Sequence, residues 1–277
     1  MTIRNARGFT LMELLVVLGI LALLATILIP KLSTLEERSR SAVQAYSTAD
    51  VARQLEIFNA LNRKYPDGFD TLLAAPAGTT LYSKLAPELK TPNTVLTTVT
   101  LTDAQIQSLS LAGVGHAFLH DTAAATVPNN SGNDRRHFGT GTGHDGTANI
   151  NTFAAVDKTT TSEGFSILVN DFGLNPNRNF PDTSSTPYPR INANEYIVFG
   201  LGNKSTFVQS QVMEAPSLDH ANSATAYSRA LLVYEVPSAT AANVGTKAKL
   251  VGIIGPDGRT KAMSVSDFNN VSGQQAH

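Results

Sequence analysis

The chain begins with a few polar residues and then runs through a long apolar stretch. From Phe9 to Ile29 the only charged residue is Glu13. A helix that crosses a bilayer needs about 20 predominantly apolar residues. The sequence therefore predicts a membrane-spanning helix over residues 9–30, with one carboxylate near its start.

Apolar positions return at three- and four-residue steps after Pro30, which predicts an amphipathic helix over residues 31–64. Its expected apolar positions are Leu32, Leu35, Ala42, Tyr46, Ala49, Ala52, Leu55, Phe58 and Leu61. Proline removes a backbone donor and clashes with the preceding turn, so we expect a kink or break at Pro30. The helix should end near Arg63. Both segments together would form a rod about 80 Å long at 1.5 Å per residue, with the second half under the head.

Beyond residue 64 the pattern changes to short β-branched and alternating runs between polar loops, which is typical of an antiparallel sheet. Strands are expected over residues 94–101, 114–119, 163–170, 195–201, 206–213 and 229–236. A further pair, 248–254 and 259–265, flanks Gly255-Pro256-Asp257-Gly258 and predicts a hairpin. The whole pattern favours an α+β fold, a long N-terminal helix packed on a β-rich head.

Helices and loops in the head are less regular. Residues 81–85 could form a helical turn, and Thr102 with Gln105 predicts a capping box that opens a short helix ending at Gly113. Residues 128–151 and 175–190 are rich in Gly, Asn and Pro and are expected to be long loops.

Composition narrows the possible functions. The 277 residues carry 21 basic and 22 acidic side chains, for a net charge of -1, so no basic surface for nucleic acid is expected. The chain has no cysteine, which excludes disulfides and thiolate metal sites. A head without disulfides must be held by its core, by partner subunits or by an ion with oxygen ligands.

Two ordinary interpretations of the N-terminal segment are incomplete. A cleaved secretory signal has an apolar region of about 7–15 residues and a small-residue cleavage site, whereas this run is longer and Ala22-Leu23-Leu24-Ala25 matches such a site poorly. A simple membrane anchor explains the length and the preceding arginines, Arg4 and Arg7, which favour the cytoplasmic side. It does not explain Glu13. Placing a carboxylate inside a membrane helix costs free energy, so such a residue indicates a function.

The stretch Gly8-Phe9-Thr10-Leu11-Met12-Glu13-Leu14-Leu15-Val16-Val17 resembles the class III signal of type IV prepilins and type II secretion pseudopilins. In that family a membrane aspartyl peptidase cuts after the glycine and methylates the new N-terminus. The resemblance implies leader cleavage between Gly8 and Phe9 and N-methylation of Phe9. It makes Glu13 the fifth residue of the mature chain, and it places Pro30 where many members have a helix-bending proline.

The resemblance also implies a role for Glu13 in assembly. The glutamate of one subunit would pair with the terminal amine of a neighbour, which removes the cost of an unpaired charge in an apolar setting. The alternative is that Glu13 simply reaches the polar interface from near the cytoplasmic end of the helix.

For the whole protein, the resemblance implies a structural subunit of a type IV pilus or a type II secretion pseudopilus, and not an enzyme. Its organisation would be a leader (1–8), a transmembrane and filament-core helix (9–30), an amphipathic helix (31–64) and a globular head (65–277). The subunit would cross the inner membrane once with its head in the periplasm, and then enter an extracellular pilus or a periplasmic pseudopilus.

The implied partners are the prepilin peptidase/methyltransferase, other pilin or pseudopilin subunits, the inner-membrane assembly platform and membrane lipid. Two alternatives of another class remain open at this point. One is a membrane-tethered head that binds a ligand or acts as an enzyme, and the other is a tip-located minor subunit that binds a substrate or a surface.

Candidate chemistry in the head is sparse. His116 and His120 are four residues apart and would form a metal pair on a helix, but Gly113 and Gly115 favour strand or loop there. His137, His144 and Asp145 lie in a glycine-rich stretch that lacks the lysine of a phosphate-binding loop. No cofactor is expected, although calcium, known in the heads of major pseudopilins, is left open. Its possible oxygen ligands are Asp145, Asn149 and Asn151, or Asp171, Asn175 and Asn177.

Overall fold

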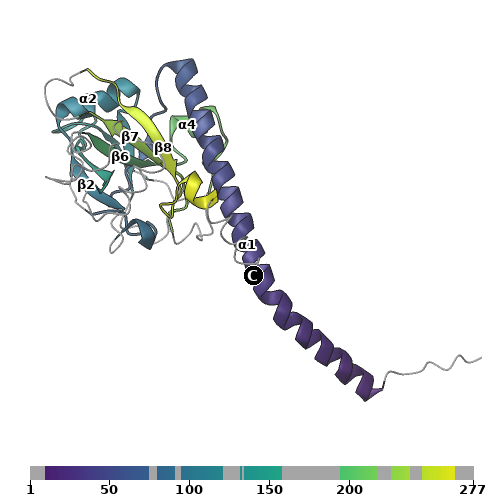
Figure 1. The fold of residues 1–277 in the computed structure, drawn as a ribbon. Helices are drawn as coiled ribbons and strands as arrows, with labels where there is room; N and C mark the ends of the chain where they lie inside the picture. Colours follow the sequence, from purple (N-terminus) through teal and green to yellow (C-terminus); the bar gives the residue numbers. More distant parts are fainter. Residues whose placement is uncertain are drawn as a thin grey trace, which may run out of the picture.

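A computed structural model describes residues 10–74, 80–90, 95–120, 132, 134–157, 194–217, 226–237 and 245–265. Figure 1 shows one long N-terminal helix that lies along a β-rich head and then projects well beyond it. The predicted α+β class is confirmed. Gly8 and Phe9, the expected strand 163–170 and the expected loop 175–190 lie outside the described residues.

The long helix α1 spans Leu11–Asn62, 52 residues, and it continues through Pro30 as one element. A kink at Pro30 stays a prediction. The helix ends at Asn62, next to the predicted end, because Arg63 adopts the left-handed conformation with φ 56° and turns the chain toward the head. Among the residues that the structure describes, no helix has the length and apolar character required of a membrane span.

The second half of α1 packs on the head, but not with the predicted apolar stripe. The face turned to the head consists of Gln44, Ala45, Thr48, Val51 and Leu55, all buried. Of the predicted stripe only Leu55 is buried, whereas Tyr46 is 77% and Leu61 73% exposed. Hydrophobic periodicity identified the helix correctly but not its orientation, because small and polar side chains make the closer contact with the head.

The head contains a mixed eight-stranded sheet. Its strands are β1 (Phe69–Asp70), β2 (Leu96–Thr100), β3 (His116–Leu119), β4 (Asp134–His137), β5 (Thr152–Val156), β6 (Glu195–Gly200), β7 (Leu231–Val236) and β8 (Lys249–Ile254). The order is β2-β5-β6-β1-β3-β4, and β7 pairs with both β6 and β8. All these pairs are antiparallel except β1 with β3, which is parallel, so the purely antiparallel expectation is wrong there.

Several expected elements are present. Strands β2, β3, β6, β7 and β8 lie within the predicted ranges. Helix α2 (Asp103–Ala112) has the predicted capping box, in which Thr102 and Gln105 bond each other's backbone amides. It ends at Gly113, whose φ is 101° and where a Cβ would lie 2.6 Å from the carbonyl oxygen of Tyr65. Only glycine fits this close turn.

Two expected strands are helical instead. Residues 206–213 contain the short helix α4 (Thr206–Ser210), because the Ser205 side chain caps it by accepting from the amide of Val208. The turn at residues 255–258 forms, and the amide of Gly255 donates to the carbonyl of Arg259 at 2.7 Å. Beyond it only Thr260 pairs with Ile254, and residues 261–265 are helical.

The expectations for residues 81–85 and 128–151 are confirmed only in part. Leu81 pairs with Leu73 in an isolated bridge, the Leu85 amide closes a turn on the Tyr82 carbonyl at 3.2 Å, and a 3-10 helix, η1 (Pro87–Leu89), follows. Residues 138–151 form turns, bends and isolated bridges, as expected of a loop. The polar stretch 128–151 contains strand β4, and the fully buried strand β5 follows it directly. A sequence as polar as that of β4 forms a strand because β3 offers an open edge with which it pairs.

The core lies between the inner face of the sheet and helices α1 and α2. Its centre is an aromatic cluster in which ring centroids lie 4.8–6.1 Å apart, formed by Phe69, Phe138, Phe153, Phe199 and Tyr234. Burial of one such side chain contributes about 1.5–3 kcal/mol. The head thus has its own core, and α1 adds Val51 and Leu55 to it.

The N-terminal helix as a candidate assembly site

Helix α1 begins with a reciprocal cap between Thr10 and Glu13. The Thr10 hydroxyl accepts from the amide of Glu13 at 3.3 Å, and a carboxylate oxygen of Glu13 accepts from the amide of Thr10 at 2.9 Å. Each bond satisfies a backbone donor that the first turn would otherwise leave unpaired. The Thr10-x-x-Glu13 pattern of a capping box is present in the sequence, although the charge of Glu13 in an apolar run is its more conspicuous property there.

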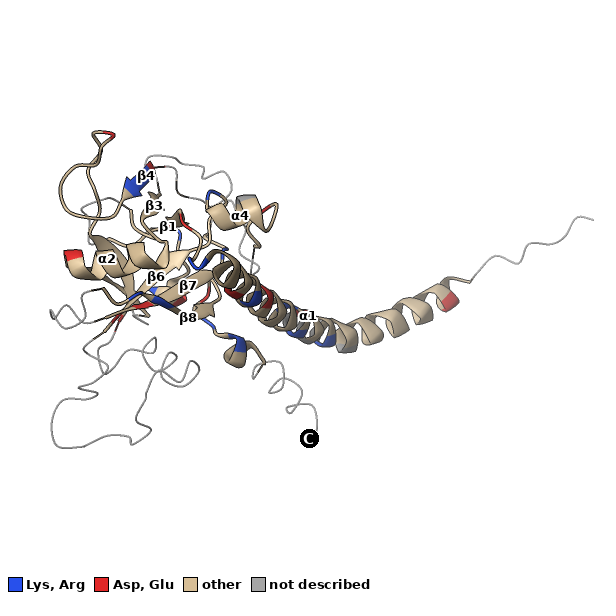
Figure 2. Ribbon diagram, turned by 90° about the horizontal axis from the view of Figure 1, so that it is seen from above, with Lys and Arg blue, Asp and Glu red and all other residues tan. Residues whose placement is uncertain are grey.

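In the first part of α1, residues 11–35, every described side chain is exposed, and this part is called the projecting segment. Its described large apolar side chains are between 48% and 83% exposed, from Leu24 to Leu11. Figure 2 shows this segment almost free of charge, in contrast with the part of α1 beside the head. Contiguous exposed apolar surface larger than a few hundred Å² marks an interaction site. The exposed apolar surface of the projecting segment therefore indicates an interaction site.

A second exposed apolar surface continues along α1 past the head. It is formed by Leu32, Leu35, Val43, Tyr46, Ile57 and Leu61, here called the outer stripe. At about 100° per residue these positions fall on one side of the helix, opposite the buried face of Gln44, Thr48, Val51 and Leu55. The described part of the head packs on the other side of α1, which leaves the outer stripe available to another molecule.

The head holds α1 at both ends of the packed part. Near its start, the Gln44 amide nitrogen donates to a carboxylate oxygen of Asp257 at 2.9 Å. Near its end, the Lys247 ammonium donates to the carbonyl of Arg63 at 2.7 Å. These contacts fix where the projecting segment leaves the head.

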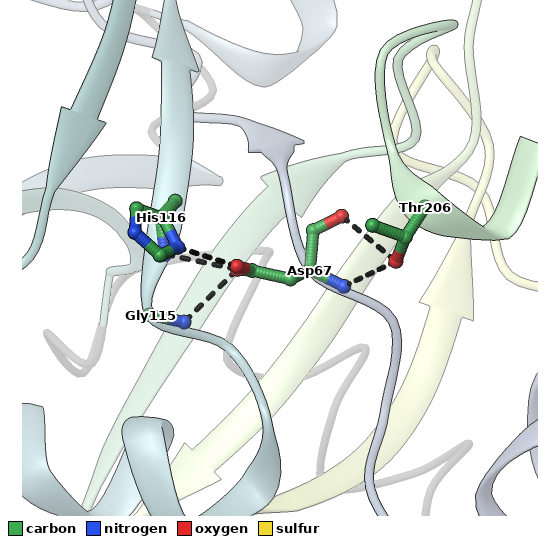
Figure 3. Close-up of polar contacts among 4 residues, drawn as sticks. All are labelled: Asp67, Gly115, His116 and Thr206. Atoms are coloured by element: carbon green, nitrogen blue, oxygen red, sulfur yellow. Dashed lines mark hydrogen bonds and ion pairs between the residues drawn. The ribbon is translucent and has the colours of Figure 1, made fainter. Parts of the chain in front are cut away.

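The two histidines that the sequence placed together are separated in the structure. His116 lies on β3, and its ring nitrogen Nδ1 is 2.5 Å from a carboxylate oxygen of Asp67 (Figure 3). His120 is buried and stacks on Tyr82 at 3.9 Å, and neither of its ring nitrogens has a hydrogen-bond partner within the described residues. Burial lowers the pKa of His120 to about 3.

No group of three or more His, Asp or Glu side chains within the described ranges is arranged to hold a metal ion. Of the possible calcium ligands, Asp145 instead accepts from the Thr147 amide and hydroxyl at 3.1 and 2.6 Å. Asp171, Asn175 and Asn177 lie outside the described residues. His144 is exposed, and His137 lies opposite His116 on the neighbouring strand, which the sequence did not indicate.

The head also contains a buried carboxyl group that the sequence did not reveal. Asp70 accepts from the amide of Gly132 and from the hydroxyl of Tyr227, both at 2.9 Å. Burial raises the pKa of Asp70 to about 7, although these two hydrogen bonds and the charges of Arg229 and Lys204 act in the opposite direction. Within the described residues, the Asp70 side chain is fully buried in the core of the head.

The family model that matches this chain covers the start of the N-terminal helix. Residues 3–29 match the family model described as the prokaryotic N-terminal methylation motif. Over 71 residues the chain is 37% identical to the type IV wide pilus major component PilA4 of Thermus thermophilus. This alignment covers 26% of the present chain and spans about half of that relative, 54% of its length. No solved structure matches the chain.

Proposed function

We propose that this chain is a structural subunit of a type IV pilus. The premise is that its N-terminal segment places it in the type IV pilin and pseudopilin family. The family indicates a structural subunit and not an enzyme. A pilus is favoured over a secretion pseudopilus because the relative with the extended alignment is a pilus component.

The observation that carries the proposal is the exposed apolar surface of the projecting segment. Its side chains are folded into a helix, capped by Thr10 and Glu13, yet they are not used in the core of the head. Burial of apolar surface that would otherwise face water is worth about 25 cal/mol per Å², so outside the membrane these helices are stable only when they pack against one another. Copies related by one repeated rotation and translation would bury these helices in the centre of an open filament.

Before assembly, the same surface would be covered by lipid. The proposal is that the apolar segment crosses the inner membrane once, with the head in the periplasm, and that the assembly platform then moves the subunit from lipid into the filament. Support comes from the absence of charge between Glu13 and Pro30 and from Arg4 and Arg7, which precede the apolar segment, since positive residues beside a span favour the cytoplasmic side.

Processing would precede assembly. The prepilin peptidase/methyltransferase would cut between Gly8 and Phe9 and methylate the Phe9 amine, which then lies directly beside the Thr10–Glu13 cap. Glu13 would pair with the amine of a neighbouring subunit, and Pro30 would bend the helix. The position of Glu13 in the first turn of α1 supports this arrangement, because its carboxylate lies close to the end of the mature chain.

Intact-mass analysis of membrane-extracted protein tests the processing step. The wild-type mass should correspond to a chain starting at Phe9 with one added methyl group. Replacing Gly8 with leucine should leave the full-length, unmethylated chain, because the peptidase requires the small residue. A wild-type chain that still begins at Met1 in a host with active peptidase would overturn the proposal.

A minor subunit at the pilus tip is the second candidate. The same 71 aligned residues are 26% of this chain and 54% of the pilus component, so the present chain is about twice as long as that relative. Immunogold labelling of the head would separate the two: regular labelling along the shaft supports a main subunit, and labelling at filament ends only supports a tip subunit.

A further inference from the structure

We propose that His116 and His137 form a binding site for a divalent first-row transition metal ion on the outer face of the sheet. The two residues are direct cross-strand partners on β3 and β4, and their ring centroids lie 4.3 Å apart. Alternation along β3 buries Ala117 and Leu119, so His116 lies on the opposite, partly exposed face. An ion can therefore reach both imidazoles without any opening of the core.

Asp67 fixes the orientation of the His116 ring. One carboxylate oxygen accepts from the backbone amides of Gly115 and His116, both at 2.9 Å, and the other lies 2.5 Å from Nδ1 of His116 (Figure 3). Asp67 is itself held through its backbone amide, which donates to the Thr206 hydroxyl at 2.9 Å. Because Nδ1 donates to the carboxylate, the lone pair of the neutral ring lies on Nε2 and faces away from Asp67. A carboxylate behind an imidazole is the arrangement that orients metal-binding histidines.

One unpaired oxygen acceptor, that of the Asn149 side chain, lies near His137. The side-chain oxygen of Asn149 is buried and has no hydrogen-bond partner within the described residues. A Cβ placed on Gly143 would lie 3.0 Å from this oxygen, 3.0 Å from a carboxylate oxygen of Asp145 and 3.4 Å from the His137 ring. An unpaired buried acceptor costs free energy, and a water molecule bound to a metal at His137 would supply the missing donor.

The residues also indicate the class of ion. Imidazole nitrogens suit copper, zinc and nickel, whereas calcium and magnesium require several oxygen ligands. Further along the same face, Arg135 lies opposite Phe118, and the Lys204 ammonium is 5.3 Å from the Phe118 ring centroid. These positive charges offset the carboxylates of Asp67 and Asp145 near the two rings, so the ion would be selected by its bonds to nitrogen and not by a strong negative field. Water would complete the coordination.

The test is Cu²⁺ titration of the full chain in detergent, without an affinity tag, followed by electron paramagnetic resonance at pH 7.5. One equivalent of Cu²⁺ should bind with two equatorial nitrogens, and Zn²⁺ should displace it. His137→Ala and His116→Ala should each lose this spectrum. His144→Ala is the matched control, because His144 is exposed in the adjacent loop and should leave the spectrum unchanged.

Asp67→Asn tests the positioning role of the carboxylate. The variant should keep the two-nitrogen spectrum but bind Cu²⁺ about 10–100-fold more weakly, as expected when the hydrogen bond behind a ligand is weakened. Unchanged binding in His137→Ala, or displacement of Cu²⁺ by millimolar Ca²⁺, would overturn the proposal. Should His116→Ala fail to fold by circular dichroism, His137→Ala on the edge strand β4 decides the result.

Discussion

At the residue scale, Glu13 combines two roles that depend on different properties. In the single subunit its carboxylate caps α1, which requires only a hydrogen-bond acceptor. In the proposed filament it pairs with an amine, which requires a negative charge. Glutamine provides the first property without the second, and Gln105 already makes the equivalent reciprocal bonds with Thr102 at the start of α2.

Glu13→Gln should therefore preserve the helix cap and processing but reduce filament assembly. Glu13→Ala should lose both the cap and the charge, and loss of such a cap costs about 1 kcal/mol of helix stability. The measurements are the mass of the processed chain and the amount of sheared filament from cells with equal subunit levels. Wild-type filament yield from Glu13→Gln would contradict the pairing role.

Asp70 and His120, two buried titratable side chains in the head, should change the free energy of unfolding with pH in opposite directions, so that their effects largely cancel. The folded-state pKa of Asp70 is raised to about 7, so its contribution to stability is lost as pH rises from about 4 to 7. The folded-state pKa of His120 is lowered to about 3, so its contribution is lost as pH falls below about 6.5. The two dependences oppose each other across the same range.

Single substitutions should expose these opposed slopes. In Asp70→Asn only the His120 dependence remains, so the free energy of unfolding should rise from about pH 4.5 to about pH 6.5. In His120→Phe only the Asp70 dependence remains, so the free energy of unfolding should fall over the same range. Each slope is limited to about 1.4 kcal/mol per pH unit for one proton. Urea unfolding followed by circular dichroism measures both, with wild type as the reference. Parallel curves for the two variants would contradict this prediction.

At the scale of elements, α1 has two apolar faces with different uses. The face with Leu55 belongs to the core of the head, whereas the outer stripe with Tyr46 belongs to the proposed filament contact. The distinction follows from packing: a face with small side chains such as Ala45 lets the helix approach the sheet closely. The bulkier residues are left on the opposite side for a neighbouring subunit.

Substitutions on the two faces should separate stability from assembly. Leu55→Ala should lower the free energy of unfolding of the head by about 2–5 kcal/mol, as expected for a cavity in a packed core. Tyr46→Ser should change it by less than about 0.5 kcal/mol, since the side chain is exposed, yet reduce filament yield. Thermal unfolding and filament yield, measured side by side, check both. A filament yield that Tyr46→Ser leaves unchanged would exclude the outer stripe from the contact.

At the scale of the whole molecule, the head and the projecting segment are separable. Within the described residues, the side chains of α1 that are buried against the head begin at Gln44, so we expect the residues before it to contribute little to folding and, in the proposed filament, to serve association. This division fits the proposed function, in which the head stays folded while the N-terminal helix moves from lipid into the filament.

A chain that begins at Lys31 should accordingly keep the fold of the head and become soluble without detergent. Its thermal unfolding midpoint should match that of the full chain within a few degrees, and size-exclusion chromatography should show a monomer. A chain that begins at Arg53 is the contrasting variant: it lacks Gln44, Thr48 and Val51 and should be strongly destabilised. Equal stability of the two truncated chains would show that α1 does not complete the core.

The sequence by itself determined the features that depend on local chemistry. The Thr102–Gln105 cap, the end of α1 near Arg63 and five strands could be predicted because capping bonds, turn residues and β-branched runs act over a few neighbouring residues. The family resemblance rested likewise on one continuous stretch, which the matched methylation motif at residues 3–29 supports.

Only the tertiary structure decided which surfaces meet. Packing against the head determines which face of α1 is buried. The polar segment of β4 forms a strand because it pairs with the open edge of β3. Asp70 and His120 become buried in the same core. It also brought His116 opposite His137, although 20 residues separate them and each had been grouped with a nearer histidine in the sequence. Pairing between distant segments depends on register and packing across the whole sheet, which local sequence patterns do not encode.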